Sequence, residues 1–176
     1  MSNEIERKWV LKKGVKPSDI KSMIESDKED SFEQFYLAEK DNTVRVRIVN
    51  DTHAILCFKG KPSDDGLSRI EIEEDIDVDF AEKLRQLSIG GLEKDRTVVM
   101  DKETGLEMEF DFYKGNLEGL VTVEIEYPSL EAVKESKIPE IVDSLFVEVT
   151  GKREYSNDQL AKFGLPKENK SSNKYC

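Results

Sequence analysis

Residues 4–9 read Glu4-Ile5-Glu6-Arg7-Lys8-Trp9. In this stretch the first, third and fifth side chains are all charged, whereas the second and the last are apolar. A period of two is typical of a β-strand whose two faces meet different surroundings. The same alternation returns along most of the chain, so the sequence predicts a sheet with one charged and one apolar face.

The alternation predicts seven further strands, joined mostly by short turns that favour hairpins. Their ranges are 32–39, 43–50, 54–61, 68–75, 94–101, 106–113 and 120–127. Helical spacing predicts helices within 17–24, 80–87, 130–145 and 156–163, with Gly90-Gly91 ending the second. Residues 26–31 read as a loop, and residues 146–152 as a short extended piece. The pattern indicates an α+β fold, an eight-stranded antiparallel β-barrel with flanking helices.

Composition favours a single acidic domain. The chain has 176 residues and a formal net charge of -11, and 37% of its residues are hydrophobic. We expect one domain over 1–165 and a disordered tail over 166–176, which is rich in Lys, Ser and Asn. The acidic balance disfavours nucleic-acid and membrane surfaces as partners. The lack of a signal-like or membrane-spanning apolar run, with two cysteines at no metal-ligand spacing, predicts a cytoplasmic location.

The charged faces carry the functional signal. Their basic members are Lys8, Arg45, Arg47, Lys59, Lys61, Arg69, Lys94 and Arg96, and their acidic members are Glu4, Glu6, Glu71, Glu73, Glu107, Glu109, Asp111, Glu124 and Glu126. An ordinary solvated face is the simplest explanation for any one strand. Here, however, the charges are almost all Glu, Arg and Lys, and they are segregated by strand. Paired carboxylates suit divalent cations, and clustered Arg and Lys suit phosphate oxygens, so we expect a lumen that binds a polyphosphate with metal.

Several short motifs resemble the CYTH superfamily, the triphosphate tunnel metalloenzymes. Residues 4–8 have the form of its ExExK signature, and other matches follow in the family's order over residues 3–163. They are Gln34-Phe35-Tyr36-Leu37, Arg45-Val46-Arg47, Lys59-Gly60-Lys61, Arg69-Ile70-Glu71-Ile72-Glu73, Lys94-Asp95-Arg96, Asp111 with Phe112 and Gly115, Glu124-Ile125-Glu126, Thr150-Gly151 and Tyr155-Ser156-Asn157. The loop after Asp111 keeps the family pattern only approximately. The short length and the first motif are most similar to the small bacterial-type inorganic triphosphatases.

The resemblance implies a tunnel that binds a small-molecule triphosphate with Mg²⁺ or Mn²⁺. The implied substrate-binding residues are Lys8, Tyr36, Arg45, Arg47, Lys59, Lys61, Arg69, Lys94, Arg96 and Lys152. The implied metal-binding residues are Glu4, Glu6, Glu71, Glu73, Asp111, Glu124 and Glu126. Glu4, Glu6 and Lys94 are the expected catalytic set, with Lys94 orienting or activating the attacking water. Residues 152–160 are expected to plug or gate one mouth of the tunnel.

Three activities stay open at this point. The first is metal-dependent hydrolysis of inorganic triphosphate or a triphosphate-bearing small molecule. The second is class IV-type adenylate cyclase activity, which needs an adenine pocket that the sequence does not reveal. The third is nucleotide or polyphosphate binding without turnover, which the two ExE pairs disfavour because binding alone needs no metal carboxylates. A homodimer is compatible with all three.

Overall fold

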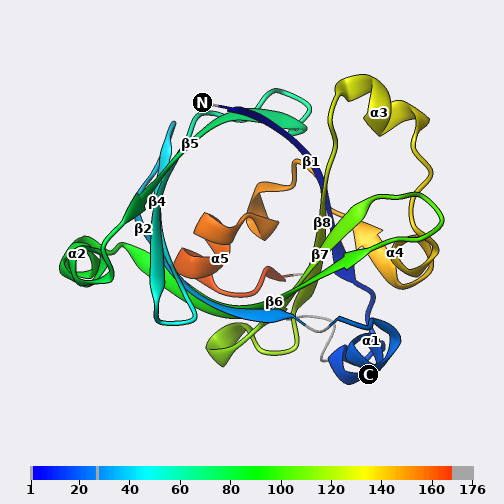
Figure 1. Cartoon of the computed structure of the whole chain (residues 1–176), viewed down its shortest axis with the longest axis horizontal. Coiled ribbons are helices and arrows are strands. Elements are labelled where there is room, and N and C mark those ends of the chain that lie inside the picture. Colours follow the sequence, from blue (N-terminus) through cyan, green and yellow to red (C-terminus); the bar gives the residue numbers. More distant parts are fainter. Residues whose placement is uncertain (1, 27, 168–176) are drawn as a thin grey trace.

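The computed structural model describes residues 2–26 and 28–167, and in this part of the chain nine strands form one sheet around a ring (Figure 1). They are β1 (Ser2–Leu11), β2 (Glu29–Glu39), β3 (Thr43–Val49), β4 (His53–Lys59), β5 (Ser68–Ile76), β6 (Gly90–Met100), β7 (Glu107–Tyr113), β8 (Val121–Glu126) and β9 (Phe146–Glu148). The order is β5-β4-β3-β2-β6-β7-β8-β1-β9, and β1 also pairs with β5. The expected eight-stranded antiparallel barrel is therefore confirmed, with β9 added beside β1.

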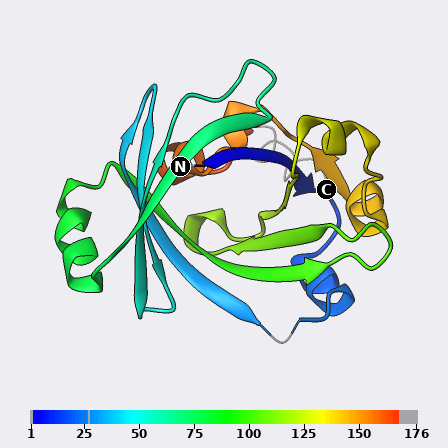
Figure 2. The ribbon, with the colours of Figure 1, turned by 45° about the horizontal axis from the view of Figure 1, so that its top comes forward.

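Strand β1 closes the barrel because its two halves pair with different neighbours. Residues 2–5 run antiparallel to β5, and residues 6–10 run antiparallel to β8. Figure 2 shows β1 as the dark blue strand that crosses the top of the ring. Since side chains alternate along a strand, Glu4, Glu6 and Lys8 all point to the same side, which is the lumen.

The helices lie mainly outside the ring. They are α1 (Pro17–Met23), α2 (Val78–Leu84), α3 (Leu130–Glu135), α4 (Glu140–Leu145) and α5 (Asn157–Phe163). Short 3₁₀ turns, η1 (Arg85–Leu87), η2 (Gly115–Leu117) and η3 (Arg153–Tyr155), complete the described part. Pro17 occupies the first turn of α1, and the Ser129 hydroxyl accepts a hydrogen bond from the Ala132 backbone N–H to cap α3. None of the described helices has the length and apolar character needed to cross a membrane.

Three of the external helices each bury part of the sheet's apolar face. Ile20 of α1 and Val142 of α4 are fully buried in a cluster with Phe110 and Val123 of the sheet. On the other side of the ring, Ala81 of α2 packs in a second cluster with β2 and β3. These contacts anchor the strands that carry the lumen's charges.

The helices cover the outer apolar face of the barrel only in part. Phe58, Ile70 and Ile72 on β4 and β5 are 43%, 51% and 46% exposed. Phe58 and Ile72 are direct cross-strand partners, so they shield one another in part. In this part of the sheet β5 is hydrogen-bonded on both sides, to β4 and, through the closing pair, to β1.

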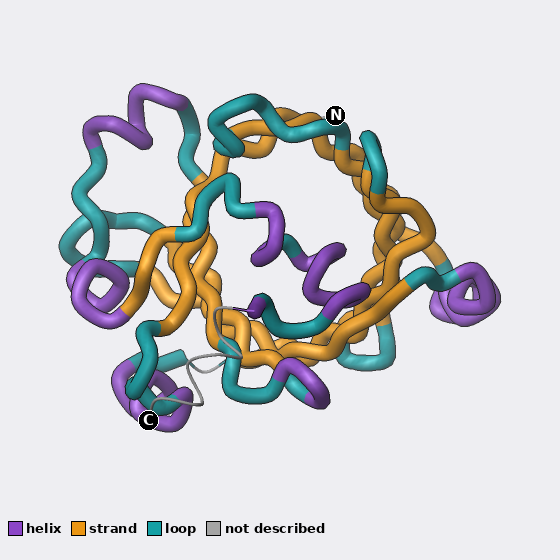
Figure 3. Tube along the Cα trace, turned by 180° about the vertical axis from the view of Figure 1, so that it is seen from behind, coloured by secondary structure: helices purple, strands orange, loops and turns teal. Residues whose placement is uncertain are grey.

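Helix α5 lies inside the ring, in contrast to the other helices (Figures 1 and 3). Leu160 of α5 is fully buried and Tyr155 of η3 is 3% exposed, and both pack with Leu92 and Leu117. The backbone of α5 comes so close to β6 that a Cβ on Gly90 would lie 3.0 Å from the Ala161 carbonyl oxygen. The glycine therefore permits the helix to sit within the barrel.

Three boundaries predicted from the sequence were wrong. The acidic residues after Ser26 extend β2 from Glu29, because Asn50 accepts a hydrogen bond from the Ser31 backbone and donates one to Asp30. Gly90 and Gly91 begin β6 and do not end the preceding helix. The helical segment expected over 130–145 is divided into α3 and α4, with Pro139 in the position before α4. Of the expected tail, Pro166 is buried, and residues 168–176 lie outside the described residues.

Candidate active site

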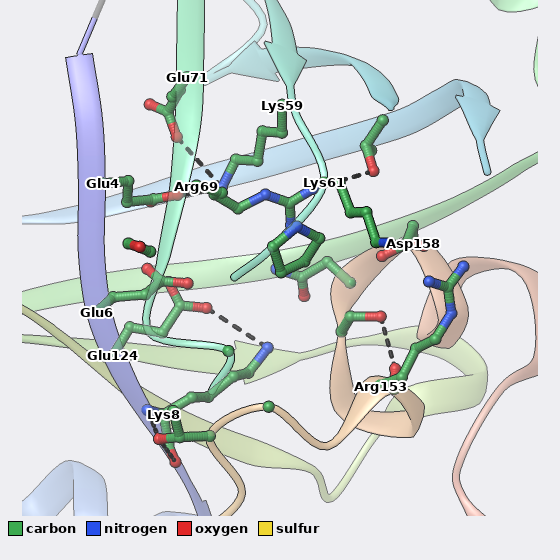
Figure 4. A pocket seen from close by; sticks show the side chains of 18 of the residues that line it. Glu4, Glu6, Lys8, Lys59, Lys61, Arg69, Glu71, Glu124, Arg153 and Asp158 are labelled. Atoms are coloured by element: carbon green, nitrogen blue, oxygen red, sulfur yellow. Dashed lines mark hydrogen bonds and ion pairs between the residues drawn. The ribbon is translucent and has the colours of Figure 1, made fainter. Parts of the chain in front are cut away.

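A cavity of about 670 Å³ occupies the lumen, and most of the residues in its wall are charged (Figure 4). Most of the residues predicted from the sequence line it: Glu4, Glu6, Lys8, Tyr36, Arg45, Arg47, Lys59, Lys61, Arg69, Glu71, Glu73, Arg96, Glu124, Glu126 and Lys152. Lys94 and Asp111 do not line it. The period-two alternation therefore brought together residues from β1, β2, β3, β4, β5, β6 and β8.

Three carboxylates form the acidic centre of this wall. Oxygen atoms of Glu4, Glu6 and Glu126 all lie within 4.8 Å of one another. Glu6 and Glu126 face each other directly across β1 and β8, where like charges destabilise a sheet. Burial and the neighbouring Glu124 and Glu4 raise the pKa of Glu6 well above its usual value. Burial and Glu109, in turn, raise the pKa of Glu126 to about 7.

An all-oxygen set of this kind fits a hard divalent cation such as Mg²⁺ or Mn²⁺. The pKa values of Glu6 and Glu126 are raised first by burial and then by neighbouring carboxylates, so the protein compensates these two charges only in part. A bound divalent cation would supply the remaining compensation. The residues present therefore fit the metal that the sequence predicted.

Glu71 and Glu73 belong to a second group, which includes the buried Cys57. Each is also a charge partner of a cation: Glu71 Oε2 lies 3.3 Å from Lys59 Nζ, and Glu73 Oε1 lies 3.5 Å from an Arg45 Nη. Glu4 of the first cluster has the same kind of partner, Lys59 Nζ at 3.0 Å, so this pairing does not separate the two groups. Glu71 and Glu73 stay predicted metal ligands, and they also hold two of the cations in the lumen wall.

Two arginines of the wall, Arg45 and Arg47, lack full compensation. Arg45 is 5% exposed, and its buried Nε has no hydrogen-bond partner among the described residues. Burial, with the nearby Arg45 and Arg96, lowers the pKa of Arg47 well below its usual value. Buried cations that repel one another favour an anion in the space they share. This geometry suits phosphate oxygens, which arginine binds with paired hydrogen bonds.

Two lysines connect the acidic and basic parts of the wall (Figure 4). Lys59 Nζ lies 3.0 Å from Glu4 Oε2. Burial lowers the pKa of Lys59, but Glu4 and other nearby carboxylates outweigh it, so this pKa lies above its usual value. Lys8 Nζ lies 3.5 Å from Glu124 Oε1 and donates a hydrogen bond of 2.8 Å to the Tyr155 carbonyl. Both ammonium groups are thus aimed into the lumen beside the carboxylate cluster.

Lys94 and Asp111 form a closed ion pair behind the wall. Their side chains have no exposed surface, and Lys94 Nζ donates a hydrogen bond of 2.7 Å to Asp111 Oδ2. Arg96 donates to both oxygens of the same carboxylate, at 2.7 and 2.8 Å. Burial raises the pKa of Asp111, but Arg96 and Lys94 outweigh it and hold that pKa well below the usual range.

Neither residue of the pair lines the cavity, and both lie behind its wall. The two Asp111 oxygens accept three hydrogen bonds from Lys94 and Arg96, and burial lowers the pKa of Lys94 to about 7. The pair fixes the orientation of Arg96, which does line the cavity. The catalytic role expected for Lys94 and the metal-binding role expected for Asp111 stay predictions.

Some residues of the wall were missed. Glu109 lines the cavity and pairs with Arg96, and its place in the alternation of β7 was a signal to which no role was attached. Glu39, Arg153 and Asp158 also line it. No motif marks them, because they enter the site from the end of β2 and from the segment inside the barrel.

Comparison with known proteins agrees with this geometry. The family model of the CYTH domain matches residues 2–163. An inorganic triphosphatase from Acetivibrio thermocellus is 32% identical over 163 residues, which cover 92% of this chain and 95% of that protein. The solved structure of the inorganic triphosphatase NE1496 has a TM-score of 0.62 at 26% identity, covering 94% of this chain and 99% of that one.

A more distant structure shares the fold. It is that of the putative adenylyl cyclase HpAC1 from Hippeastrum, described as having a dominant triphosphatase activity, with a TM-score of 0.57 at 22% identity and coverage of 74% and 82%. At that identity the likeness shows the fold alone. The family model, by contrast, spans nearly all the described residues, and the barrel carries that family's charged lumen. The protein therefore belongs to the CYTH domain family.

Proposed function

We propose that this protein hydrolyses inorganic triphosphate to pyrophosphate and orthophosphate, with Mg²⁺ or Mn²⁺ bound by Glu4, Glu6 and Glu126. The observation that carries the proposal is the presence, in one cavity, of a carboxylate cluster and of arginines without full compensation. The named relative from Acetivibrio thermocellus supports the same activity.

The basic residues of the lumen bind the phosphate groups, and the carboxylates hold the metal ion. Three cations hold phosphate oxygens, namely Lys8, Arg45 and Arg47. Lys8 points into the lumen, the Nε of Arg45 has no hydrogen-bond partner among the described residues, and burial and neighbouring arginines lower the pKa of Arg47. Arg96, fixed by Asp111, offers its remaining guanidinium surface to the same anion. A bound metal ion would neutralise phosphate charge and lower the pKa of a coordinated water. Water adds to a terminal phosphorus, the P–O bond to pyrophosphate breaks, and the water's proton leaves with the products.

The lining favours a bare polyphosphate over a nucleotide. Tyr36 is the one aromatic ring among the described residues that line the cavity, and it is 3% exposed. The apolar side chains there are limited to Pro62, Leu67 and Val149. A purine site usually presents apolar or aromatic surface, so the wall offers little to an adenine ring. This argues against the adenylate cyclase alternative.

The test is a product analysis. The protein is incubated separately with inorganic triphosphate and with ATP, each with Mg²⁺, with Mn²⁺ or with a chelator. We expect equimolar orthophosphate and pyrophosphate from triphosphate, only with metal present. Cyclic AMP from ATP would establish the cyclase instead.

A variant separates turnover from binding. Glu4→Gln/Glu6→Gln should abolish hydrolysis while triphosphate still binds, because the arginines are intact. Glu107→Gln, an exposed carboxylate on β7 outside the cavity wall, is the matched control and should behave as wild type. Tight binding of triphosphate by the wild type without product under any metal would leave only the binding function.

A further inference from the structure

The segment after β9 closes one end of the lumen from within. Its apolar residues Tyr155 and Leu160 are buried against the barrel wall, and its polar residues Ser156, Asn157 and Asp158 line the cavity (Figure 4). Figures 1 and 3 show α5 within the ring of strands from both sides. A phosphate chain therefore meets a wall at this end and does not pass through the barrel.

Glu39 attaches this segment to the barrel. It stands at the last position of β2, and its side chain is 14% exposed. Its carboxylate accepts hydrogen bonds from Gln159 Nε2 at 2.9 Å and from Lys162 Nζ at 2.7 Å. Its backbone carbonyl accepts one from an Arg153 Nη at 3.2 Å. One residue of β2 thus holds three residues spread along η3 and α5.

The attachment also reaches the phosphate-binding groups. The Tyr155 carbonyl, which belongs to the same segment, accepts the hydrogen bond from Lys8 Nζ. The Lys162 side chain lowers the pKa of Glu39, with Gln159 and Arg153 acting in the same direction, so the carboxylate stays charged at neutral pH. Displacing η3 and α5 would therefore have two effects. It would open this end of the barrel, and it would break the hydrogen bond between Lys8 and the Tyr155 carbonyl.

We infer that Glu39 is a positioning residue that keeps α5 inside the barrel and thereby restricts the site to short phosphate chains. The inference rests on the proposed function, because it concerns which polyphosphate the same site accepts. With one end closed, a triphosphate fits wholly within the cavity. A long chain enters only by one terminus, and its remaining phosphates stay outside the lumen's cations.

The experiment compares two substrates across two variants. kcat and KM are measured for triphosphate and for long-chain polyphosphate, counted per chain end, in the wild type, Glu39→Gln and Lys162→Met. We expect the wild type to favour triphosphate by about tenfold or more in kcat/KM. Each variant should reduce that preference by about fivefold, the upper range for loss of a partly exposed ion pair. If Glu39 had a purely structural role, its replacement would lower kcat/KM equally for both substrates, and the ratio of the two kcat/KM values would not change.

The control is Glu103→Gln, which removes an exposed ion pair with Lys137 of the same length, 2.7 Å, away from the cavity. It should leave the ratio as in the wild type. Equal efficiency of the wild type on both substrates, or an unchanged ratio in both variants, would overturn the inference.

Failure of the proposed function is recognised separately. If the wild type releases no product from triphosphate, calorimetric binding of the two polyphosphates without metal replaces turnover as the readout. The wild type should then bind triphosphate more tightly than the long chain, and both Glu39→Gln and Lys162→Met should reduce this preference. That result would still support the inference that α5 closes one end of the lumen. Equal affinity of the wild type for both chains, or a preference that neither variant changes, would overturn it.

Discussion

At the scale of single residues, the carboxylates of the lumen reveal a compromise between stability and function. Glu6 and Glu126 face each other across two strands, and each holds its proton more tightly than an ordinary glutamate. A barrel selected only for stability would place opposite charges in such a pair. The repulsion is understandable if a divalent cation is normally shared by the two side chains and Glu4.

Replacing one of these carboxylates should therefore separate activity from stability. We expect Glu6→Gln to lower kcat/KM for triphosphate by about a hundredfold or more, because a directed charge in a shielded site is lost. The same change relieves repulsion, so the metal-free variant should unfold at the same or a higher temperature than the metal-free wild type. Steady-state kinetics and thermal unfolding check the two halves. A variant both inactive and much less stable would contradict this explanation.

For the buried Lys94–Asp111 pair we expect the opposite effect on stability, namely that a substitution destabilises the protein. Asp111→Asn removes the carboxylate that pairs directly with Lys94, in a site that has no exposed surface. Loss of one partner from a buried ion pair costs about 3–5 kcal/mol in the free energy of unfolding. Urea denaturation measures this cost.

Glu103→Gln serves as the comparison here as well, since its pair with Lys137 is exposed at 59% and 71% and little change is expected. If Asp111→Asn were as mild as Glu103→Gln, the stabilising role assigned to the pair would be wrong.

At the scale of elements, the strands and their faces could be predicted because the signal is local. Alternation along β1 or β3 determines which side chains share a face, and hairpin turns limit the pairing. The residue pattern alone does not place α5 inside the barrel, because Leu160 and Tyr155 have the pattern of any helix that packs on a sheet. Which side of the sheet they pack on depends on strands far away in the sequence. The expected plug over residues 152–160 came from the family resemblance.

Glycines illustrate the same limit. A Gly-Gly pair after a helix is typical of a helix end, so Gly90 and Gly91 were assigned to one. In the structure the backbone of Ala161 and that of Gln34 approach these two positions closely, which requires that side chains be absent. The sequence shows that a glycine is present, but only the tertiary contacts show the reason.

A close contact between glycines supplies a test at this scale. The loop after β4 meets the segment after β9 where a Cβ on Gly66 would lie 2.5 Å from the Gly151 Cα. Gly66→Ala should therefore displace this loop, which carries Lys61, and raise KM for triphosphate as well as lowering stability.

The matched control for this test is Gly105→Ala. Gly105 has nearly the same positive φ, 73° against 74°, with no atom within 4 Å of its added Cβ. It should lose only the backbone contribution of about 1 kcal/mol, with no change in KM. Equal effects of the two variants on KM and stability would show that contact with Gly151 is unimportant.

At the scale of the whole molecule, the net charge of -11 conflicts at first with a polyanionic substrate. The conflict is resolved because the described residues of the cavity wall are nearly balanced in charge, with ten Arg or Lys against eleven Asp or Glu, so most of the excess negative charge lies outside it. Composition alone cannot show this distribution. The period-two alternation predicted which side chains share a face. The pairing of β1 with β5 closes the sheet, so the charged face becomes the lumen.

The same closed barrel links metal binding, stability and pH. A carboxyl whose pKa is raised in the folded state binds its proton more tightly there than in the unfolded chain. Ionising Glu126 therefore destabilises the metal-free protein as pH rises from about 4.5 through about 7, and ionising Glu6, whose pKa is also raised, acts in the same direction. Above this window Glu126 is charged, and metal no longer competes with a proton for it. We expect Mg²⁺ to raise the unfolding temperature much more at about pH 8 than at about pH 5.5.

Glu126→Gln isolates the contribution of one titrating group. Without metal, this variant should gain stability relative to the wild type as pH rises, because it has no charge to develop beside Glu6. With Mg²⁺ it should show a smaller increase in unfolding temperature at high pH, because one ligand is missing. Thermal unfolding at several pH values, with Mg²⁺ or a chelator, gives both comparisons. A metal-induced shift independent of pH in the wild type would mean that the cation binds away from these carboxylates, and that the cluster is not the metal site.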